Sequence, residues 1–123
     1  VFEANSGQLS VTSTATVNDD VWHQVAVTVD ATGNKLYIDG VVAAVTHTVG
    51  SAATQKFFSS VTGVDFMAIG GDQNSGGLRA MFTGLIDDVR VYDRALSPVD
   101  IAQLATTAPA IAVGSPRWIA TLM

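Results

Sequence analysis

The sequence contains no cysteine, and this absence excludes several classes of protein. A 123-residue chain without thiols cannot form a disulfide scaffold, a thiolate metal site or a cysteine nucleophile. Basic residues are also scarce. The sequence has six Lys and Arg against eleven Asp and Glu, which gives a net charge of −5. A nucleic-acid-binding surface needs clustered cations to displace counterions, so the composition excludes nucleic acid as a partner. No apolar run approaches the roughly 18 residues of a membrane span, so none is predicted.

Glutamate and lysine are scarcer still, which points to the kind of fold. Ten of the eleven acidic residues are Asp, only Glu3 is Glu, and Lys occurs twice. Glu and Lys favour helices, whereas the abundant Val and Thr favour strands and Asp and Gly favour turns. With 48% hydrophobic residues the chain can bury a core, and its length suits one domain. The composition therefore predicts one all-β domain.

Alternating apolar residues predict several short strands separated by turns. The clearest is Val21–Asp30, in which valines and His23 share one face. Asp39-Gly40 lies between two apolar runs and predicts a tight hairpin, because both residues tolerate positive φ. The expected strands are residues 8–16, 21–30, 35–38, 41–45, 64–70 and 81–92, the last interrupted near Asp87-Asp88. Residues 71–77 are expected to form a polar, Gly-rich loop.

One helix is predicted near the end of the chain. Ser97 suits an N-cap, Pro98 the first helical position, and Asp100 the capping-box position. The helix is expected to reach about residue 105, with Ile101 facing the core. Residues 106–123, which contain two prolines and a glycine, are interpreted as a tail or linker. The domain is therefore assigned to residues 1–105, as an antiparallel β-sandwich or barrel with one short C-terminal helix.

Three segments resemble laminin-G-like modules. Residues 22–28 (Trp-His-Gln-Val-Ala-Val-Thr) are similar to the Trp-His-x-Val-Ala strand of that family, and residues 36–40 (Leu-Tyr-Ile-Asp-Gly) to its Leu-Tyr-x-Asp-Gly hairpin. Residues 82–97 resemble its closing strand and helix entry, and the order and spacing agree over about residues 8–105. The resemblance implies the concanavalin A-like lectin/glucanase fold, an all-β antiparallel jelly roll of two sheets.

One departure from that family concerns the N-terminal region. Family members usually carry several strands before the Trp-His strand, but only about twenty residues precede Trp22 here. Either the first strands are missing or the domain is abbreviated, and the opening Val-Phe-Glu-Ala-Asn, without Met or a signal peptide, suggests a fragment or a processed form. A half-built sandwich exposes apolar faces and edges, so we expect a homodimer or a partner segment that completes the sheet.

The acidic residues do not match the pattern of a glycosidase. Glucanases of this superfamily place carboxylates at alternate positions of one strand, so that acid and nucleophile face one cleft. Asp87 and Asp88 are adjacent, and a regular strand sends adjacent residues to opposite faces. No catalytic residues are therefore assigned and a non-enzyme is expected, with a glycoside-acting enzyme as the less favoured alternative.

Metal binding has one candidate residue. His23 and His47 lack zinc spacing, and the favoured interpretation of His23 is a buried, hydrogen-bonded side chain. Asp72-Gln73-Asn74 begins like a calcium loop but lacks the Glu that an EF-hand needs. Modules of the resembled family often hold one calcium, and Asp87 is the first candidate ligand. The favoured interpretation of Asp87 is a carboxylate that stabilises a bulge or turn through backbone N–H groups.

The ligand-binding candidates lie in the polar stretch 72–79. Asp72, Gln73, Asn74 and Arg79 are types that hydrogen-bond sugar hydroxyls, and loops carry function on rigid scaffolds. The strand aromatics Trp22, Tyr37 and Tyr92 are interpreted as core or sheet packing instead. By resemblance, we expect a non-catalytic recognition module of a larger secreted or cell-surface protein, with a glycan or an extracellular protein as its partner. A structural or assembly domain without a small ligand is the alternative.

Overall fold

The structure is a computed structural model that describes residues 2–4, 9–57, 68–74, 77–79, 81–107 and 117–122. Its elements in chain order are β1 (Phe2–Ala4), β2 (Leu9–Ser13), β3 (His23–Asp30), β4 (Gly33–Ile38), β5 (Val41–Val42), β6 (Val45–Val49), β7 (Asp72–Asn74), β8 (Gly77–Arg79), β9 (Leu85–Val91), α1 (Pro98–Thr106) and β10 (Arg117–Leu122). No helix among these residues is long and apolar enough to cross a membrane.

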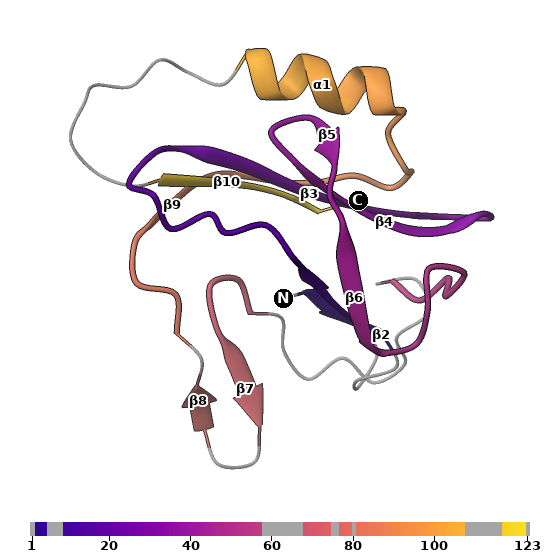
Figure 1. Cartoon of the computed structure of the whole chain (residues 1–123), viewed down its shortest axis with the longest axis horizontal. Coiled ribbons are helices and arrows are strands. Elements are labelled where there is room, and N and C mark those ends of the chain that lie inside the picture. The colour runs from indigo at the N-terminus through magenta and orange to yellow at the C-terminus, as the bar shows by residue number, and fades with distance from the viewer. Residues whose placement is uncertain are drawn as a thin grey trace.

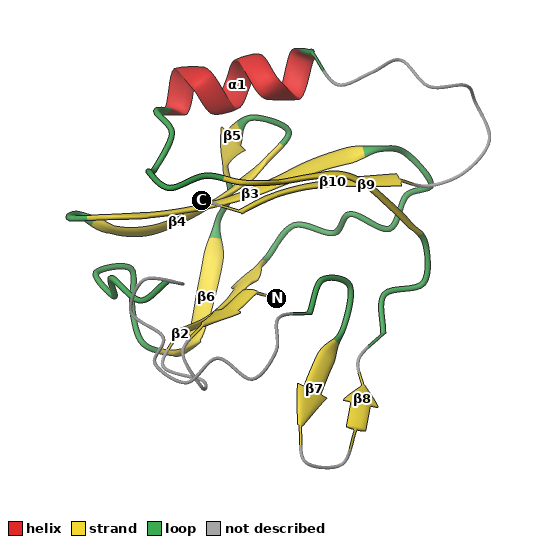
Figure 2. Cartoon of the chain, turned by 180° about the vertical axis from the view of Figure 1, so that it is seen from behind, coloured by secondary structure: helices red, strands yellow, loops and turns green. Residues whose placement is uncertain are grey.

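The strands form two main sheets in separate layers. Five strands pair in the order β5-β4-β3-β10-β9, and three pair in the order β1-β2-β6. Helix α1 lies over one side of the five-stranded sheet, and the three-stranded sheet lies on the other side (Figures 1 and 2). The two-layer β-sandwich with one short C-terminal helix confirms the predicted fold class.

Strand β10 differs from the sequence-based expectation. The sequence predicts a tail or linker over residues 106–123, but Arg117–Leu122 is a strand between β3 and β9 and runs parallel to both. Parallel neighbours need a long connection, usually through a helix, and the chain between β9 and β10 passes through α1. The other described pairs are antiparallel. The Pro and Gly residues that suggested a linker precede this strand.

The predicted strand 41–45 is divided between the two sheets. Val41–Val42 pairs with β4 in the five-stranded sheet, whereas Val45–Val49 pairs with β2 in the three-stranded sheet. The hairpin before this crossing agrees with the prediction, because Asp39 and Gly40 have φ values of 53° and 79°. Most of the predicted strand 64–70 lies outside the described residues, and its last three residues form no strand.

Helix α1 covers the buried core of the five-stranded sheet. The cluster of buried side chains beneath it is formed by Ala26, Tyr37, Leu96 and Ile101. Ile101 has no exposed surface, as the sequence predicts. The helix begins at the predicted capping box, since the Ser97 side chain accepts the Asp100 N–H and the Asp100 side chain accepts the Ser97 N–H. The cap and the core therefore fix the helix on the sheet.

The two faces of β3 are both covered, which alternation alone does not reveal. Gln24, Ala26 and Thr28 are buried although two of them are polar. On the face beneath the helix, Ala26 pairs with Tyr37. On the opposite face, Val27 pairs with Leu36, and all four side chains are buried. Since both faces are packed, β3 is the central support for the residues described below.

Candidate functional site

Strands β7 and β8 form a two-stranded hairpin that belongs to neither main sheet. It extends away from the layer of α1 and the five-stranded sheet (Figures 1 and 2). The sequence predicts a polar, Gly-rich loop over residues 71–77, but in the structure Asp72–Asn74 pairs with Gly77–Arg79. The candidate ligand-binding residues are therefore held on a paired backbone rather than an open loop.

The register of this hairpin brings most of the candidates together. Asp72 lies directly opposite Arg79, Gln73 opposite Leu78, and Asn74 opposite Gly77. Because strand positions alternate between faces, Asp72, Asn74 and Arg79 occupy one face of the hairpin and Gln73 the other. A carboxylate, an amide and a guanidinium at neighbouring positions suit hydrogen bonding to hydroxyl groups.

Asp87, the predicted calcium ligand, is an exposed residue of β9 at an irregularity in the sheet. Its Oδ1 accepts the backbone N–H of Asp88 at 2.8 Å, and Asp88 has a φ of 50°. This is the contact expected of a carboxylate that stabilises a bulge. Among the described residues, no group of three or more His, Asp or Glu side chains is placed to hold a metal ion. Calcium binding at Asp87 stays a prediction.

The neighbouring Asp88 is engaged by an arginine. Arg90 donates from Nε to Asp88 Oδ1 at 2.7 Å and from Nη2 to Oδ2 at 2.8 Å. The pKa of the Arg90 guanidinium is raised, first by its hydrogen bonds to Asp88 and second by its hydrogen bond to Tyr92.

Two of the strand aromatics, Tyr37 and Tyr92, pack in the core. Tyr37 is buried in the cluster under α1, and Tyr92 packs against that cluster. Trp22 is half-buried, just before β3. Trp118 lies on β10, at the position opposite His23. Because Tyr37 and Tyr92 do not offer an exposed ring, the polar residues of the hairpin remain the better candidates for contact with a sugar.

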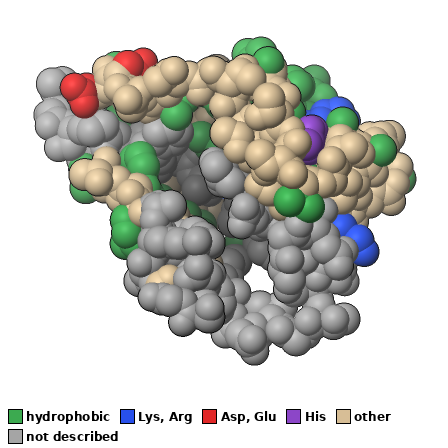
Figure 3. Space-filling model, turned by 60° about the horizontal axis from the view of Figure 1, so that its bottom comes forward, with side chains coloured by type: hydrophobic (Ala, Val, Ile, Leu, Met, Phe, Trp, Pro, Cys, Tyr) green, Lys and Arg blue, Asp and Glu red, His purple; other side chains and the backbone are tan. Residues whose placement is uncertain are grey.

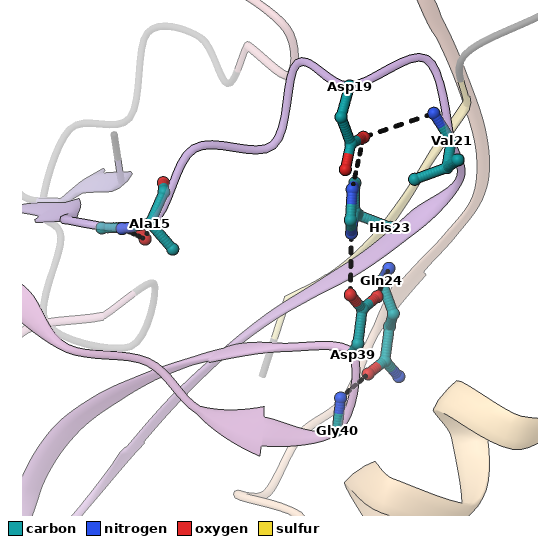
Figure 4. Close-up of polar contacts among 8 residues, drawn as sticks. Ala15, Asp19, Val21, His23, Gln24, Asp39 and Gly40 are labelled. Atoms are coloured by element: carbon teal, nitrogen blue, oxygen red, sulfur yellow. Dashed lines mark hydrogen bonds and ion pairs between the residues drawn. The ribbon is translucent and has the colours of Figure 1, made fainter.

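A second polar cluster was not identified from the sequence. His23, at the start of β3, lies between two aspartates in line (Figure 4). Its Nδ1 is 2.7 Å from Asp39 Oδ2, and its Nε2 is 2.9 Å from Asp19 Oδ1. The His23 side chain is only 12% exposed, which agrees with the predicted buried, hydrogen-bonded histidine. The sequence identifies Asp39 only as a turn former, because its contact with His23 joins residues 16 positions apart.

Burial and hydrogen bonding act on His23 in opposite directions. Burial favours the neutral ring and lowers the pKa, but the hydrogen bonds to Asp39 and then to Asp19 favour the charged ring. The net effect raises the pKa of His23 above its ordinary value. The reciprocal hydrogen bond from His23 lowers the pKa of the Asp19 carboxyl.

Gln24 connects this cluster to the helix. The Gln24 backbone N–H donates to Asp39 Oδ1 and the backbone C=O accepts the Asp39 N–H, both at 2.9 Å. Its side chain accepts the Gly40 N–H at 3.1 Å and donates to the C=O of Ile101 at 3.4 Å. A buried polar residue on the helix-facing side of β3 therefore satisfies backbone groups of both the turn and α1.

Charged side chains are sparse on the face shown in Figure 3. On the face shown in Figure 3, acidic and basic side chains lie at opposite ends, and the basic ones are few.

Comparison with known proteins then identifies the family. The sequence profile of a laminin-G-like family, described as the concanavalin A-like lectin/glucanases superfamily, matches residues 1–102. The chain belongs to this family. The match confirms the resemblance carried by the Trp-His strand, the Asp-Gly hairpin and the closing strand.

Relatives of the laminin-G-like chain occur in much longer proteins. The chain is 27% identical over 110 residues to the rat protein named "Sushi, von Willebrand factor type A, EGF and pentraxin domain-containing protein 1". The match covers 85% of this chain and 3% of that protein. The mouse protein of that name is 28% identical with the same coverage. Anhydrosialidase of Macrobdella decora is 42% identical over 48 residues, which is 39% of this chain and 6% of that protein.

A solved structure supports the fold. An S-layer domain-containing protein from Clostridium thermocellum superposes with a TM-score of 0.57 at 28% identity, covering 76% of this chain and 43% of that one. The chain thus spans a small part of its curated relatives and less than half of this structure. Their names describe whole proteins, of which this chain matches only a part.

Proposed function

We propose that the chain is a non-catalytic recognition module of a secreted or cell-surface protein and that it binds a glycan through the β7–β8 hairpin. The observation that carries this proposal is the register of the hairpin, which sets Asp72 opposite Arg79 and places Asn74 on the same face. Acceptor and donor groups at neighbouring positions on an element outside both sheets suit the hydroxyl pattern of a sugar.

The family and the relatives support the extracellular part of this proposal. One relative carries EGF and pentraxin domains by its name, and the structural relative is an S-layer domain-containing protein. Both names fit modules that work at or outside the cell surface. An extracellular protein is the alternative ligand class, and the experiment below separates it from a glycan.

The chemistry of the described carboxylates supports a non-catalytic role. A glycosidase needs two carboxyl groups facing one cleft. Asp88 is occupied by Arg90 through two hydrogen bonds, and Asp87 accepts the backbone N–H of Asp88. Neither carboxylate is set as a free acid or nucleophile. The match to anhydrosialidase covers 39% of the chain, so it does not argue for an enzyme over the whole domain.

The direct test uses a glycan array and an array of extracellular proteins, each with wild-type protein and the Asp72→Ala variant. We expect a defined set of glycans to bind the wild-type protein and binding to fall about tenfold or more in the variant, because a hydrogen bond to a charged group is lost. The matched control is Asp93→Ala, which removes one exposed carboxylate elsewhere and should leave binding unchanged. Equal loss in both variants, or release of sugar by the pure protein, would overturn the proposal.

A second candidate function, an assembly domain, is favoured by the edge of the five-stranded sheet. Strand β9 is the last strand of that sheet, and four of its apolar side chains are exposed: Leu85, Ile86, Val89 and Val91. An apolar edge strand is a template for pairing with another chain. Light scattering after size-exclusion chromatography tests this candidate. If the chain is an assembly domain, the wild-type protein should be a dimer and Val89→Lys should be a monomer. A monomeric wild-type protein would exclude it.

A further inference from the structure

We propose that His23 is a pH-sensitive latch: its charged ring ties the segment 17–22 to the Asp39-Gly40 turn, and loss of the ring proton releases that segment at Asp19. The segment connects β2, in the three-stranded sheet, to β3, in the five-stranded sheet. The latch therefore acts on a connection between the two layers of the sandwich.

The first argument is the number of donors that the geometry requires. An ionised carboxylate only accepts hydrogen bonds, and a neutral imidazole has one N–H. The His23 ring places one nitrogen 2.7 Å from Asp39 and the other 2.9 Å from Asp19. Only the imidazolium donates through both nitrogens, so this arrangement selects the charged ring.

The second argument concerns which contact is lost. Asp39 is held by two hydrogen bonds to the backbone of Gln24. The Asp39 N–H donates to the Gln24 C=O, and Asp39 Oδ1 accepts the Gln24 N–H. The Asp19 side chain is 56% exposed, and its other described hydrogen bond is from the Val21 N–H at 3.3 Å. A neutral ring keeps its proton on Nδ1 toward the fixed Asp39. Its Nε2 lone pair then faces the Asp19 carboxylate, two acceptors repel, and Asp19 moves away.

Both carboxylates that contact the His23 ring favour its charged form, whereas the cationic residue next to its register position on β10 does not. Asp19 comes from the preceding segment, with Asp20 beside it, and Asp39 comes from the turn after β4. On the other side of β3, β10 carries Arg117 next to the position opposite His23. The raised pKa of His23 agrees with the dominance of its two aspartate contacts over burial.

The test follows the ring and the segment separately by NMR across pH 5 to 9. Ring 15N shifts report whether both His23 nitrogens are protonated, and amide hydrogen exchange, corrected for intrinsic rates, reports the order of residues 17–22. We expect the His23 midpoint to lie above that of the same residue in the urea-unfolded chain. The protection of the Val21 amide against exchange should fall about tenfold as the pH rises through that midpoint. This is the change expected for the loss of one charge-assisted hydrogen bond.

Two matched variants decide the assignment. Asp19→Asn removes one carboxylate charge at the ring and should lower the His23 midpoint and remove the pH dependence of protection. Asp20→Asn makes the same charge change one residue along and should leave both nearly unchanged. The proposal is wrong if the wild-type His23 midpoint is at or below the unfolded value, or if protection over residues 17–22 is the same on both sides of it. The wild-type measurement decides the matter even if a variant does not fold.

Discussion

Gly40 lies directly against Ala102 of α1: a Cβ added to Gly40 would come 2.8 Å from the Ala102 Cα. The turn also has φ of 79° at this residue. Glycine at this position therefore allows both the tight turn after β4 and the close approach of the helix. The same Asp-Gly pair that predicts a hairpin from sequence also sets the distance between the hairpin and α1.

Replacement of this glycine should destabilise the protein through two separable effects. A positive φ costs a side-chain-bearing residue about 1–2 kcal/mol, and the contact with Ala102 should add about 1–3 kcal/mol. Gly77→Ala is the matched control, because Gly77 also has a positive φ, 102°, and an added Cβ would meet no atom of the described residues within 4 Å. Urea unfolding should rank Gly40→Ala as less stable than Gly77→Ala. Equal losses would show that the helix does not press on the turn.

The seating of α1 on the sheet gives a second prediction. Ile101 has no exposed surface in the core under the helix, whereas Val99 of the same helix is 65% exposed. Ile101→Ala should reduce the free energy of unfolding by about 2–5 kcal/mol, because it leaves a cavity. Val99→Ala should change it by less than about 0.5 kcal/mol. Similar effects at both positions would mean that the helix is not packed as described.

The helix cap gives a third prediction, with a pH dependence. Ser97→Ala should cost about 1 kcal/mol, and Gln103→Ala, at an exposed position of the same helix, is the control. The Ser97 hydroxyl and then its backbone N–H lower the pKa of the Asp100 carboxyl below its ordinary value. A lowered pKa stabilises the folded state above the unfolded pKa, and this stabilisation is lost as the pH falls through the folded pKa. The difference between wild type and Ser97→Ala should therefore shrink in acid. A constant difference would contradict the carboxylate's part in the cap.

Much of the framework could be predicted from sequence because local patterns determine it. The Asp-Gly turn, the capping box and the interrupted strand at Asp87-Asp88 each depend on neighbouring residues, and all are present. Long-range pairing could not be obtained in this way. Neither the insertion of β10 between β3 and β9 nor the contact of His23 with Asp39 has a local signal.

The candidate site shows the same division. The polar residue types of the hairpin could be selected from composition, but the pairing of Asp72 with Arg79 depends on a register that alternation does not reveal in a Gly-rich segment. For Asp87 the sequence offered two interpretations, and the described contact with Asp88 matches the bulge-stabilising one.

Calcium binding gives a fourth prediction and distinguishes those interpretations. If Asp87 is a calcium ligand, calorimetric titration of the purified protein with CaCl2 should show one site, and Asp87→Asn should abolish it. The matched control is Asp93→Asn, which should retain the site. No heat of binding at millimolar CaCl2 would leave Asp87 with its role at the bulge alone.

The measurement that tests the proposed recognition function most directly is a 1H–15N NMR titration of the wild-type protein with the glycan that binds best on the array. We predict that the largest shift changes fall on residues 72–79 and that they disappear in Asp72→Ala while the rest of the spectrum stays folded. Changes concentrated on β9, or on no part of the hairpin, would contradict recognition through β7 and β8.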